Sequence, residues 1–273
     1  MRQLDEIKAQ LKSEPDEQLS MTDPDARSMA TSRLGSGIVG YNVQVAVDAK
    51  HHLIVAHDVT NESSDRSKLS TMAVAARAAM GKARLQAHAD RGYYNCLEIK
   101  ACDDRGIAAY VPKTMTSTAK ATGRFGKSDF IYLAKVDQYR CPAGESLYRC
   151  PDQVADGLKM HVYAKYGCGK CPLRASCTPG TSRRIKRWEH EAVLDAVQRR
   201  LDRRPSAMTV RKRTVEHVFG TLKHWMGSAH FLTRRLPNVA TEMSLHVLAY
   251  NLKRVMHILG VGKAMKAMRL AGA

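Results

Sequence analysis

Alternation of apolar and polar positions is the first ordered pattern along the chain. The segment YNVQVAVDA at 41–49 has an apolar residue at every second position, which is the period of a half-buried β-strand. The apolar members of this face are Val43, Val45 and Val47. After two turn residues, the second apolar run HLIVAHDVT at 52–60 completes a predicted β-hairpin.

Helix and strand patterns alternate after the hairpin. The segment 67–80 has the period of an amphipathic helix, with its apolar stripe at Leu69, Met72, Ala76 and Met80. We then expect a short strand over 83–90, a helix over 97–105 and a strand over 106–113. A chain that alternates in this way builds a mixed α/β sheet.

The second half of the chain has a different pattern. Residues 113–182 are rich in Thr, Ser, Gly, Lys and Cys, and they predict a loop-rich insertion that has no hydrophobic core. Helices are then expected over 188–204, 208–226 and 238–259. In the last of them we expect a buried stripe at Leu245, Leu248, Leu252, Val255 and Leu259.

The formal net charge of +18 over 273 residues points to the kind of partner. An apolar content of 44% is enough for a globular core, and no apolar run approaches the roughly 18 residues of a membrane span. We therefore expect a soluble, cytoplasmic protein that binds a nucleic acid and no membrane. Half of the charge lies in 183–235, where fourteen Lys or Arg stand against five Asp or Glu, a balance of +9. This segment is the predicted nucleic-acid surface, the alternative being a set of ordinary solvated helix faces.

Carboxylates in three separate motifs are unusual against this basic background. Asp90 in ADRGYYN ends a predicted strand, and Glu216 in TVEHVFG lies on a predicted helix. TDPDAR contains Asp23 and Asp25. Carboxylates can hold divalent cations, and a basic protein attracts a polyanion. The combination indicates metal-ion chemistry on a phosphodiester. For each acid alone, the alternative is an ordinary surface residue or ion-pair partner.

Basic residues accompany Glu216. Lys223 follows it by seven residues, or two helical turns, so both side chains are expected on one face, with Lys223 near DNA phosphate. Arg211, Lys212 and Arg213 precede it and are expected to contact DNA as well.

These motifs resemble those of the DDE transposases of bacterial insertion sequences. ADRGYYN is similar to the family's second-aspartate motif, and VEHVFG with Lys223 is similar to its glutamate motif. GYNVQVAVD and AHDVTN extend the resemblance, which runs over about residues 17–260. The family's arginine four residues before the glutamate is replaced by Lys212, with Arg211 and Arg213 on either side, so which base takes that role stays open.

The resemblance implies a ribonuclease H-like fold, in which helices flank a mixed β-sheet and a Cys-rich insertion separates the second Asp from the Glu. It places the first strand at 17–23. It divides the chain into a linker remnant (1–16), the first part of the catalytic core (17–112), the insertion (113–182), the helical part with the Glu (183–262) and a tail (263–273). Because relatives carry an N-terminal DNA-binding region, the chain is expected to be a C-terminal fragment.

The resemblance also implies that Asp23, Asp90 and Glu216 together hold Mg²⁺ or Mn²⁺. The family pattern favours Asp23 over Asp25. The other candidates are Asp48, Asp58 and Asp65, the last of which is expected to cap the helix that follows it. The implied reaction is cleavage of phosphodiester bonds at the ends of a transposable element and strand transfer into target DNA, by a homo-oligomer on DNA in the bacterial nucleoid. A metal-dependent nuclease on the same scaffold and an inactive DNA-binding remnant are the alternatives.

Seven cysteines are an odd number, which does not favour a disulfide framework. Cys168 and Cys171 form a Cys-x₂-Cys pair, Cys177 follows, and Cys141 lies upstream, at spacings typical of a structural Zn²⁺ site. Cys150 is the rival for the fourth position, and Cys96 and Cys102 are expected to be core thiols. The alternative is that the four are free thiols.

Overall fold

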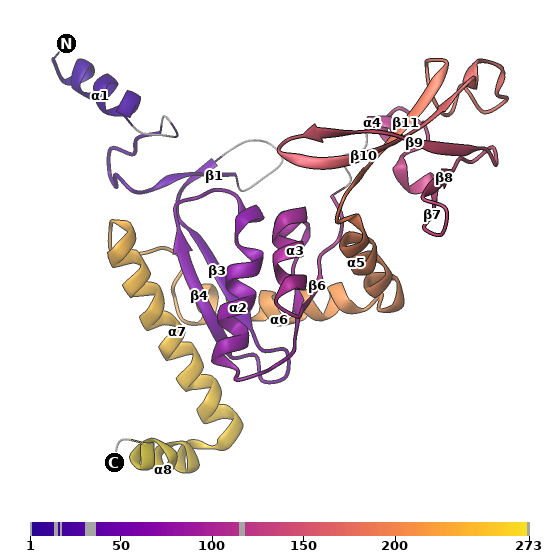
Figure 1. The fold of residues 1–273 in the computed structure, drawn as a ribbon. Coiled ribbons are helices and arrows are strands. Elements are labelled where there is room, and N and C mark those ends of the chain that lie inside the picture. The colour runs from indigo at the N-terminus through magenta and orange to yellow at the C-terminus, as the bar shows by residue number, and fades with distance from the viewer. Residues whose placement is uncertain (1, 14–15, 17, 31–36, 115–117, 272–273) are drawn as a thin grey trace. The chain divides into compact units, whose positions relative to one another are not determined.

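A computed structural model of the protein describes residues 2–13, 16, 18–30, 37–114 and 118–271. The chain divides into two compact units (Figure 1). Unit 1 consists of Met1–Pro112 and Val197–Ala273, and unit 2 consists of Lys113–Ala196. Among the described residues, no helix has the length and apolar character that crossing a membrane requires.

Unit 1 contains three two-stranded sheets in its described part. They pair β1 (Arg27–Ala30) with β2 (Gly37–Gly40), β3 (Asn42–Val47) with β4 (Ile54–Thr60), and β5 (Leu85–His88) with β6 (Ile107–Tyr110). The antiparallel β3–β4 pair confirms the predicted hairpin. The parallel β5–β6 pair confirms the predicted strand–helix–strand unit.

Most of the helices that the structure describes belong to unit 1. They are α1 (Arg2–Ser13), α2 (Leu69–Ala79), α3 (Cys96–Asp104), α6 (Ala207–Gly220), α7 (Leu236–Leu259) and α8 (Val261–Ala271). A π-helical turn, Thr221–Trp225, continues α6, and 3₁₀ turns lie at Asp65–Ser67 and Arg91–Tyr93. Helix α5 (Glu191–Arg203) contains the boundary between the units.

Two sequence expectations about the strands differ from the structure. The expected strand over 17–23 is wrong for its described residues, because the chain there turns around Pro24: the Ala26 N–H donates to the carbonyl oxygen of Asp23, and the first strand begins only at Arg27. The strands expected in one mixed sheet form separate pairs. The protein is mixed α/β, and the ribonuclease H-like order stays a prediction.

The main core of unit 1 packs α6 and α7 against the β3–β4 hairpin. Val43, Val45 and Val47 pack against this core, as the alternation predicts. The apolar stripe predicted for the last long helix is wrong. The buried residues of α7 include Val239, Met243, Val247 and Tyr250, whereas Leu245 and Leu248 on its other side are 60% and 64% exposed.

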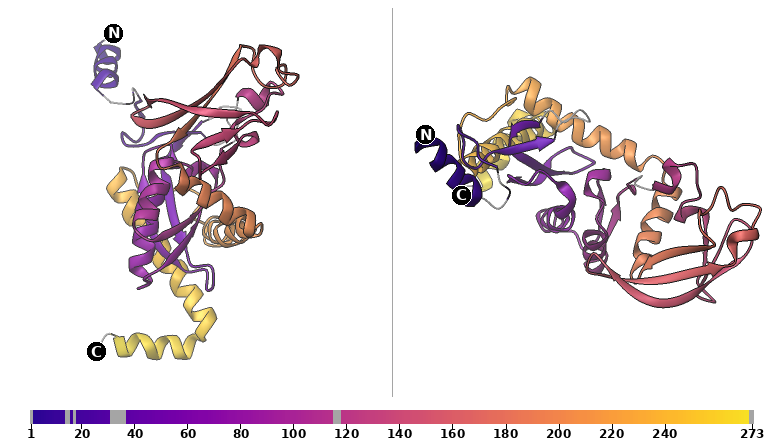
Figure 2. Two further views of the ribbon diagram at one scale, coloured as in Figure 1. Left: turned by 45° about the vertical axis from the view of Figure 1, so that its right-hand side comes forward. Right: turned by 90° about the horizontal axis from the view of Figure 1, so that it is seen from above.

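Unit 2 is an antiparallel β-sheet and not a loop-rich insertion. Its strands, in the order β11-β10-β9-β8-β7, are β7 (Ile131–Leu133), β8 (Gln138–Arg140), β9 (Ser146–Ala155), β10 (Leu158–Tyr166) and β11 (Ser182–Trp188). A short helix α4 (Thr118–Ala121) and 3₁₀ turns at Lys127–Asp129 and Cys168–Lys170 accompany the sheet. Figure 2 shows the long β9–β10 hairpin from two further directions.

The expectation that this segment has no hydrophobic core is wrong as well. Its core consists of Phe130, Tyr139, Leu147, Tyr163 and Ile185. The sequence contains a signal for the sheet, because Asp156-Gly157 is a favoured two-residue hairpin turn, and both residues have positive φ angles of 51° and 74°.

Candidate active site

Asp90 lies at the end of β5, where a 3₁₀ turn begins. Its Oδ1 accepts a hydrogen bond of 2.9 Å from the Gly92 N–H and so caps the turn. Its Oδ2 accepts a bond of 2.6 Å from the guanidinium of Arg211 on α6. The two side chains are 44% and 22% exposed, so the ion pair lies at the surface of unit 1 and is open to solvent on one side.

A second carboxylate, Asp65, lies beside Asp90. A Cβ atom added to Gly92 would lie 3.0 Å from Asp90 Oδ1 and 3.3 Å from Asp65 Oδ2, so both carboxylates lie close to Gly92. The side chains of Asn42 and Gln44 each donate to Asp65 Oδ1 at 2.7 Å. The expectation that Asp65 caps a helix is wrong, since Ser64 is the residue whose side chain caps the turn there.

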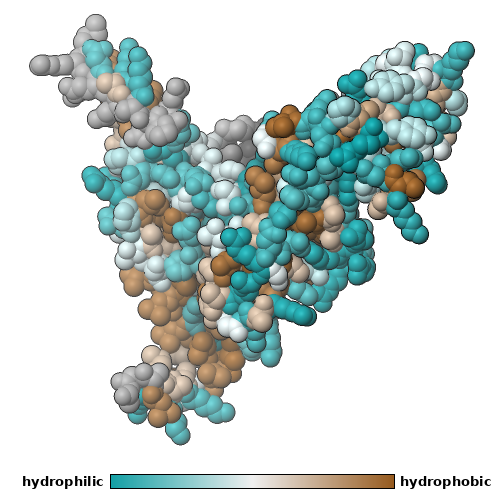
Figure 3. All heavy atoms as spheres, in the orientation of Figure 1, coloured by the Kyte–Doolittle hydropathy of each residue, from teal (hydrophilic) through white to brown (hydrophobic). Residues whose placement is uncertain are grey.

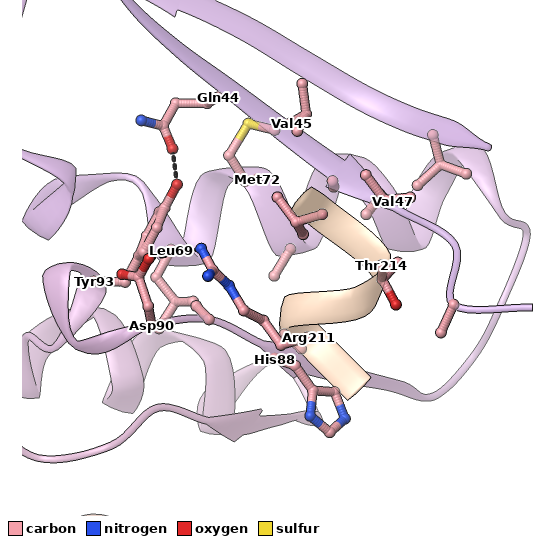
Figure 4. Close-up of a pocket in the computed structure, with 18 of the residues that line it drawn as sticks. Gln44, Val45, Val47, Leu69, Met72, His88, Asp90, Tyr93, Arg211 and Thr214 are labelled. Carbon is pink, nitrogen blue, oxygen red and sulfur yellow. Dashed lines mark hydrogen bonds and ion pairs between the residues drawn. The ribbon is translucent and has the colours of Figure 1, made fainter. Parts of the chain in front are cut away.

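Tyr93 connects this pair to β3. Its hydroxyl donates to Gln44 Oε1, and Figure 4 shows the bond at one end of a cavity. Burial raises the pKa of Tyr93, and the negative charges of Asp65 and Asp90 raise it further, so the hydroxyl stays protonated at neutral pH. Its one hydrogen is donated to Gln44, whose side-chain amide in turn donates to Asp65.

The cavity has a volume of about 400 Å³ and is bounded by β3, α2, the end of β5, and α6. Its polar lining includes Asp48, Asp65, Asp90, Arg211 and Thr214. Its apolar lining comes from the valines of β3 and from Leu69, Met72 and Ala76 of α2. A largely apolar pocket with a few polar groups in its lining has the general form of a ligand site.

Asp23 and Asp25 are bound elsewhere in unit 1, at the N-terminus of α7. Asp25 Oδ2 accepts from the Leu236 N–H at 2.8 Å, and Asp23 Oδ1 accepts from the Arg235 N–H at 3.1 Å. The Tyr41 hydroxyl donates to Asp23 Oδ2 at 2.7 Å. Both acids therefore satisfy N–H groups at a helix start, where a negative charge is also favoured by the helix dipole.

Glu216 lies on the exposed side of α6. Its neighbour Val215 lines the cavity, while Glu216 is exposed and does not line it. The expectation that Lys223 shares its face assumed a regular α-helix, but the turn that contains Lys223 is π-helical. The Lys223 ammonium lies 5.8 Å from the centre of the Phe219 ring, which is part of the cavity wall.

The three carboxylates do not form a metal site in this structure. Within the described residues, no group of three or more His, Cys, Asp or Glu side chains is arranged to hold a metal ion. Asp23 and Asp90 also have different partners, since one caps α7 and the other binds Arg211. The carboxylate that the structure does bring near Asp90 is that of Asp65.

The basic residues near Glu216 have two different environments. Arg211 is half-buried and bound to Asp90, so its guanidinium neutralises an acid of the protein itself. Lys212 and Arg213 are exposed on α6. Of the three, these two are placed to meet a polyanion from solvent.

Four cysteines of unit 2 surround a small cavity of about 30 Å³. Cys141, Cys168, Cys171 and Cys177 all line it, and Cys150 does not. These four cysteines are free thiols in the structure. Burial raises the pKa of Cys177, and the three neighbouring thiols raise it further, while the charge of Arg183 lowers it. The sulfur atoms surround one space but are not arranged as a metal site, so zinc binding stays a prediction.

The two cysteines expected in the core differ from each other. Cys102 on α3 is fully buried, and burial raises its pKa to about 11. Cys96, at the start of the same helix, is only partly buried.

Comparison with known proteins gave one family match. Residues 140–256, less than half of the chain, match the family model of the transposase DDE domain. The matched range contains Glu216, Lys223 and the four clustered cysteines, and it excludes Asp23 and Asp90. Comparisons with curated proteins and with solved structures gave no match. The family match supports a DDE-type transposase, an enzyme that cleaves nucleic acid.

Proposed function

We propose that this chain is the catalytic part of a DNA transposase. It cleaves phosphodiester bonds at the ends of a transposable element and joins the freed 3′ ends to target DNA. The observation that carries the proposal is the transposase DDE match over residues 140–256, whose range includes Glu216 and its basic neighbours. The net charge of +18 supports DNA as the partner.

The proposed ligands for Mg²⁺ or Mn²⁺ are Asp23, Asp90 and Glu216. In a transposase of this type the ion supplies charge stabilisation and activates the attacking oxygen. The three side chains do not fit an ion as they lie in this structure, because no group of three is arranged to hold one among the described residues.

The chain's own groups suit the binding of a polyanion near Asp90. The Arg211 guanidinium neutralises the Asp90 carboxylate, which lowers the repulsion that a DNA phosphate meets there. The exposed Lys212 and Arg213 lie on the same helix and add positive charge. The Tyr93 hydroxyl stays protonated beside the two acids, so it adds no negative charge to this end of the site.

A DNA-binding protein without catalytic activity is the second candidate. It is favoured because no group of three ligands is arranged to hold a metal among the described residues, while Asp23 caps α7 and Glu216 is exposed. This candidate keeps the basic surface and needs no metal.

A strand-joining experiment separates the two. Labelled DNA duplexes with randomised ends and free 3′-hydroxyls are incubated with the protein and a plasmid, in Mg²⁺, in Mn²⁺ or in a chelator, and joined products are sequenced. The transposase proposal predicts metal-dependent joining with a consensus at the joined end. Nicking without joining indicates a nuclease, and binding alone indicates the non-catalytic protein.

A further inference from the structure

The cavity of about 400 Å³ lies between two strands of unit 1 that are each paired on one side only. Strand β3 pairs with β4 and strand β5 with β6, and no strand among the described residues pairs with the second edge of β3 or of β5. Residues 42–49 and 85–90 line the cavity without a break. Because successive side chains of a strand point to opposite faces, a cavity that both sets line lies beside the strand edges. Figure 4 shows Gln44 and Val45 of β3 on the other side of the cavity from His88 of β5.

Helices cover the two faces of this gap between β3 and β5. Both α2 and α6 contact both strands, and Figure 1 shows α2 in front of the strands and α6 behind them. The apolar walls come from Leu69, Met72 and Ala76 on α2 and from Val210 and Val215 on α6. The gap is therefore bounded by strand edges on two sides and by apolar helix faces on the other two.

Strand β5, which faces the gap, is less buried than its partner β6. Ile107, Ala109 and Tyr110 of β6 are buried, whereas β5 has no buried residue. β6 lies on the far side of the pair, and an outermost strand is normally the more exposed one. The exposure of β5 comes from the open space beside it. Protein interiors contain few voids larger than a water molecule, so a cavity of this size between two strands indicates a site that is filled by something else.

We propose that the gap receives an extended segment of a different polypeptide, which pairs with β3 on one side and with β5 on the other. Such a segment joins the β3–β4 and β5–β6 pairs into one sheet, by the strand addition that proteins use to bind extended peptides. All described strands of both units already have partners, so neither this chain nor a second copy has a free strand to supply. The inference concerns the fold of unit 1 and does not depend on catalytic activity.

The lining of the gap specifies the chemistry of the segment. The N–H and C=O groups along two strand edges require a peptide backbone between them, which neither a nucleic acid nor a small apolar molecule offers. The helix walls require apolar side chains on both faces of the segment, as in a strand from the middle of a sheet. Its length is about that of β3, or six residues. Only the end beside Asp65, Asp90 and Arg211 suits a polar residue.

A second apolar area of unit 1 gives no such indication. Figure 3 shows hydrophobic side chains over α7 and its junction with α8, and Leu245 and Leu248 belong to this area. The backbone groups of a helix are paired within the helix, so its apolar face does not specify the conformation of what covers it. The edges of β3 and β5 do specify it, because only an extended backbone can pair with both.

The test measures the binding of a synthetic peptide to the purified protein by fluorescence anisotropy. The peptide alternates valine and isoleucine over the six-residue length of β3. Lysines at both ends keep it soluble, and the net charge of +18 repels them, so binding cannot come from charge alone. Two further peptides carry N-methyl groups on one or the other alternate set of backbone amides. Because each set of N–H groups faces one strand edge, either modification should weaken binding at least about tenfold.

A substitution that fills the gap tests where the peptide binds. Ala76 is buried on α2 and lines the cavity, so Ala76→Phe should weaken peptide binding at least about tenfold. Ala75→Phe is the matched control, because Ala75 is exposed on the same helix and does not line the cavity. Hydrogen exchange of the wild type guards against a variant that only misfolds. The amides of both β3 and β5 should become protected when the peptide binds.

Several results would overturn the proposal. The first is the absence of peptide binding. The second is a loss of binding with only one of the N-methylated peptides, which would place the peptide on a single strand edge. The third is unchanged binding with both, which would indicate apolar adsorption. Protection of β3 and β5 that rises with protein concentration in the absence of peptide would assign the gap to a second copy of the chain instead.

Discussion

Carboxylates of unit 1 and thiols of unit 2 were both predicted as metal ligands, but only the thiols line one common cavity. The four cysteines surround one cavity of about 30 Å³. The three acids have different environments: Asp23 caps α7, Asp90 binds Arg211, and Glu216 is exposed. The thiols have few competing partners, whereas both predicted aspartates accept hydrogen bonds from other groups of unit 1.

The difference shows that the spacing of residues in a sequence predicts a shared site only when the residues are close together in the chain. Cys168, Cys171 and Cys177 lie within ten residues, so local turns bring them together: the Cys171 N–H donates to the Cys168 carbonyl, and the Cys177 N–H to that of Arg174. Asp23, Asp90 and Glu216 come from segments far apart in the chain, and only the tertiary arrangement can unite them. Sequence motifs identify such acids as candidates but do not predict their positions relative to one another in the fold.

The largest effect is expected from zinc in unit 2. Protein purified under reducing conditions should contain about one zinc per chain, by elemental analysis, because the four cysteines around one cavity match the number of ligands in a tetrahedral zinc site. A strong chelator should then lower the melting temperature by about 10 °C or more. Cys171→Ser should lose the metal, and Cys150→Ser should keep it, since Cys150 lies outside the cavity. Metal-free protein with unchanged melting would make the four cysteines ordinary thiols.

Replacing Asp90 tests the carboxylate side of the comparison. Asp90→Asn should lower strand joining by roughly 100-fold or more, the loss of a ligand that stabilises transition-state charge by several kcal/mol. Stability should change by less than about 1 kcal/mol, because the ion pair with Arg211 is partly exposed. Asp48→Asn is the control, since Asp48 lines the same cavity. An equal loss of strand joining in Asp90→Asn and Asp48→Asn would contradict the role of Asp90 as a metal ligand.

Removing the acids that cap α7 should affect stability instead. Asp23→Ala with Asp25→Ala leaves the N–H groups of Arg235 and Leu236 without acceptors, at a cost of about 2 kcal/mol in urea unfolding. The single Asn variants keep an acceptor and should stay near wild-type stability. If Asp23 is also a ligand, Asp23→Asn loses strand joining while Asp25→Asn keeps it. If both variants keep strand joining, Asp23 acts only as a cap of α7.

The smallest effect is expected on DNA affinity. Lys212→Ala with Arg213→Ala should weaken binding to all sequences and flatten the logarithmic salt dependence by about 1.8, or about 0.9 for each lost phosphate contact. The control removes two exposed cations of unit 2, Lys135 and Arg140, which lie outside the basic segment. An equal change in both variants would mean that DNA contact is spread over the protein.

Much of the local structure follows from the sequence. The valines of β3 and the amphipathic α2 repeat at the periods that their elements require, so the hairpin and the helix were predictable. The sheet of unit 2 was not predictable, because charged residues within its strands obscure the alternation of apolar and polar positions. Arg183, Arg184 and Lys186 of β11 are examples. The outer leucines of α7 were expected to be buried, since periodicity identifies an apolar face but does not say which face meets the core.

The Asp90 environment was predictable only in part. The turn and its aspartate were predictable from the motif ADRGYYN. The proximity of Asp65 to Asp90 was not, because it depends on how the segments pack in the fold. One signal was present in the sequence: Asn42 and Gln44 are polar at alternate positions of β3, on the face opposite its valines, and both donate to Asp65. A polar pair on the second face of a strand is a reason to look for an acceptor nearby.

The most direct test of the catalytic proposal is the metal preference of Asp90→Cys in strand joining. A thiolate binds Mg²⁺ poorly and the softer Mn²⁺ better, so a true ligand changes its preferred ion when sulfur replaces oxygen. We predict that the ratio of the joining rate in Mn²⁺ to that in Mg²⁺ rises at least about tenfold over wild type. An unchanged ratio, or a wild-type chain that joins no DNA in either ion, would contradict the account.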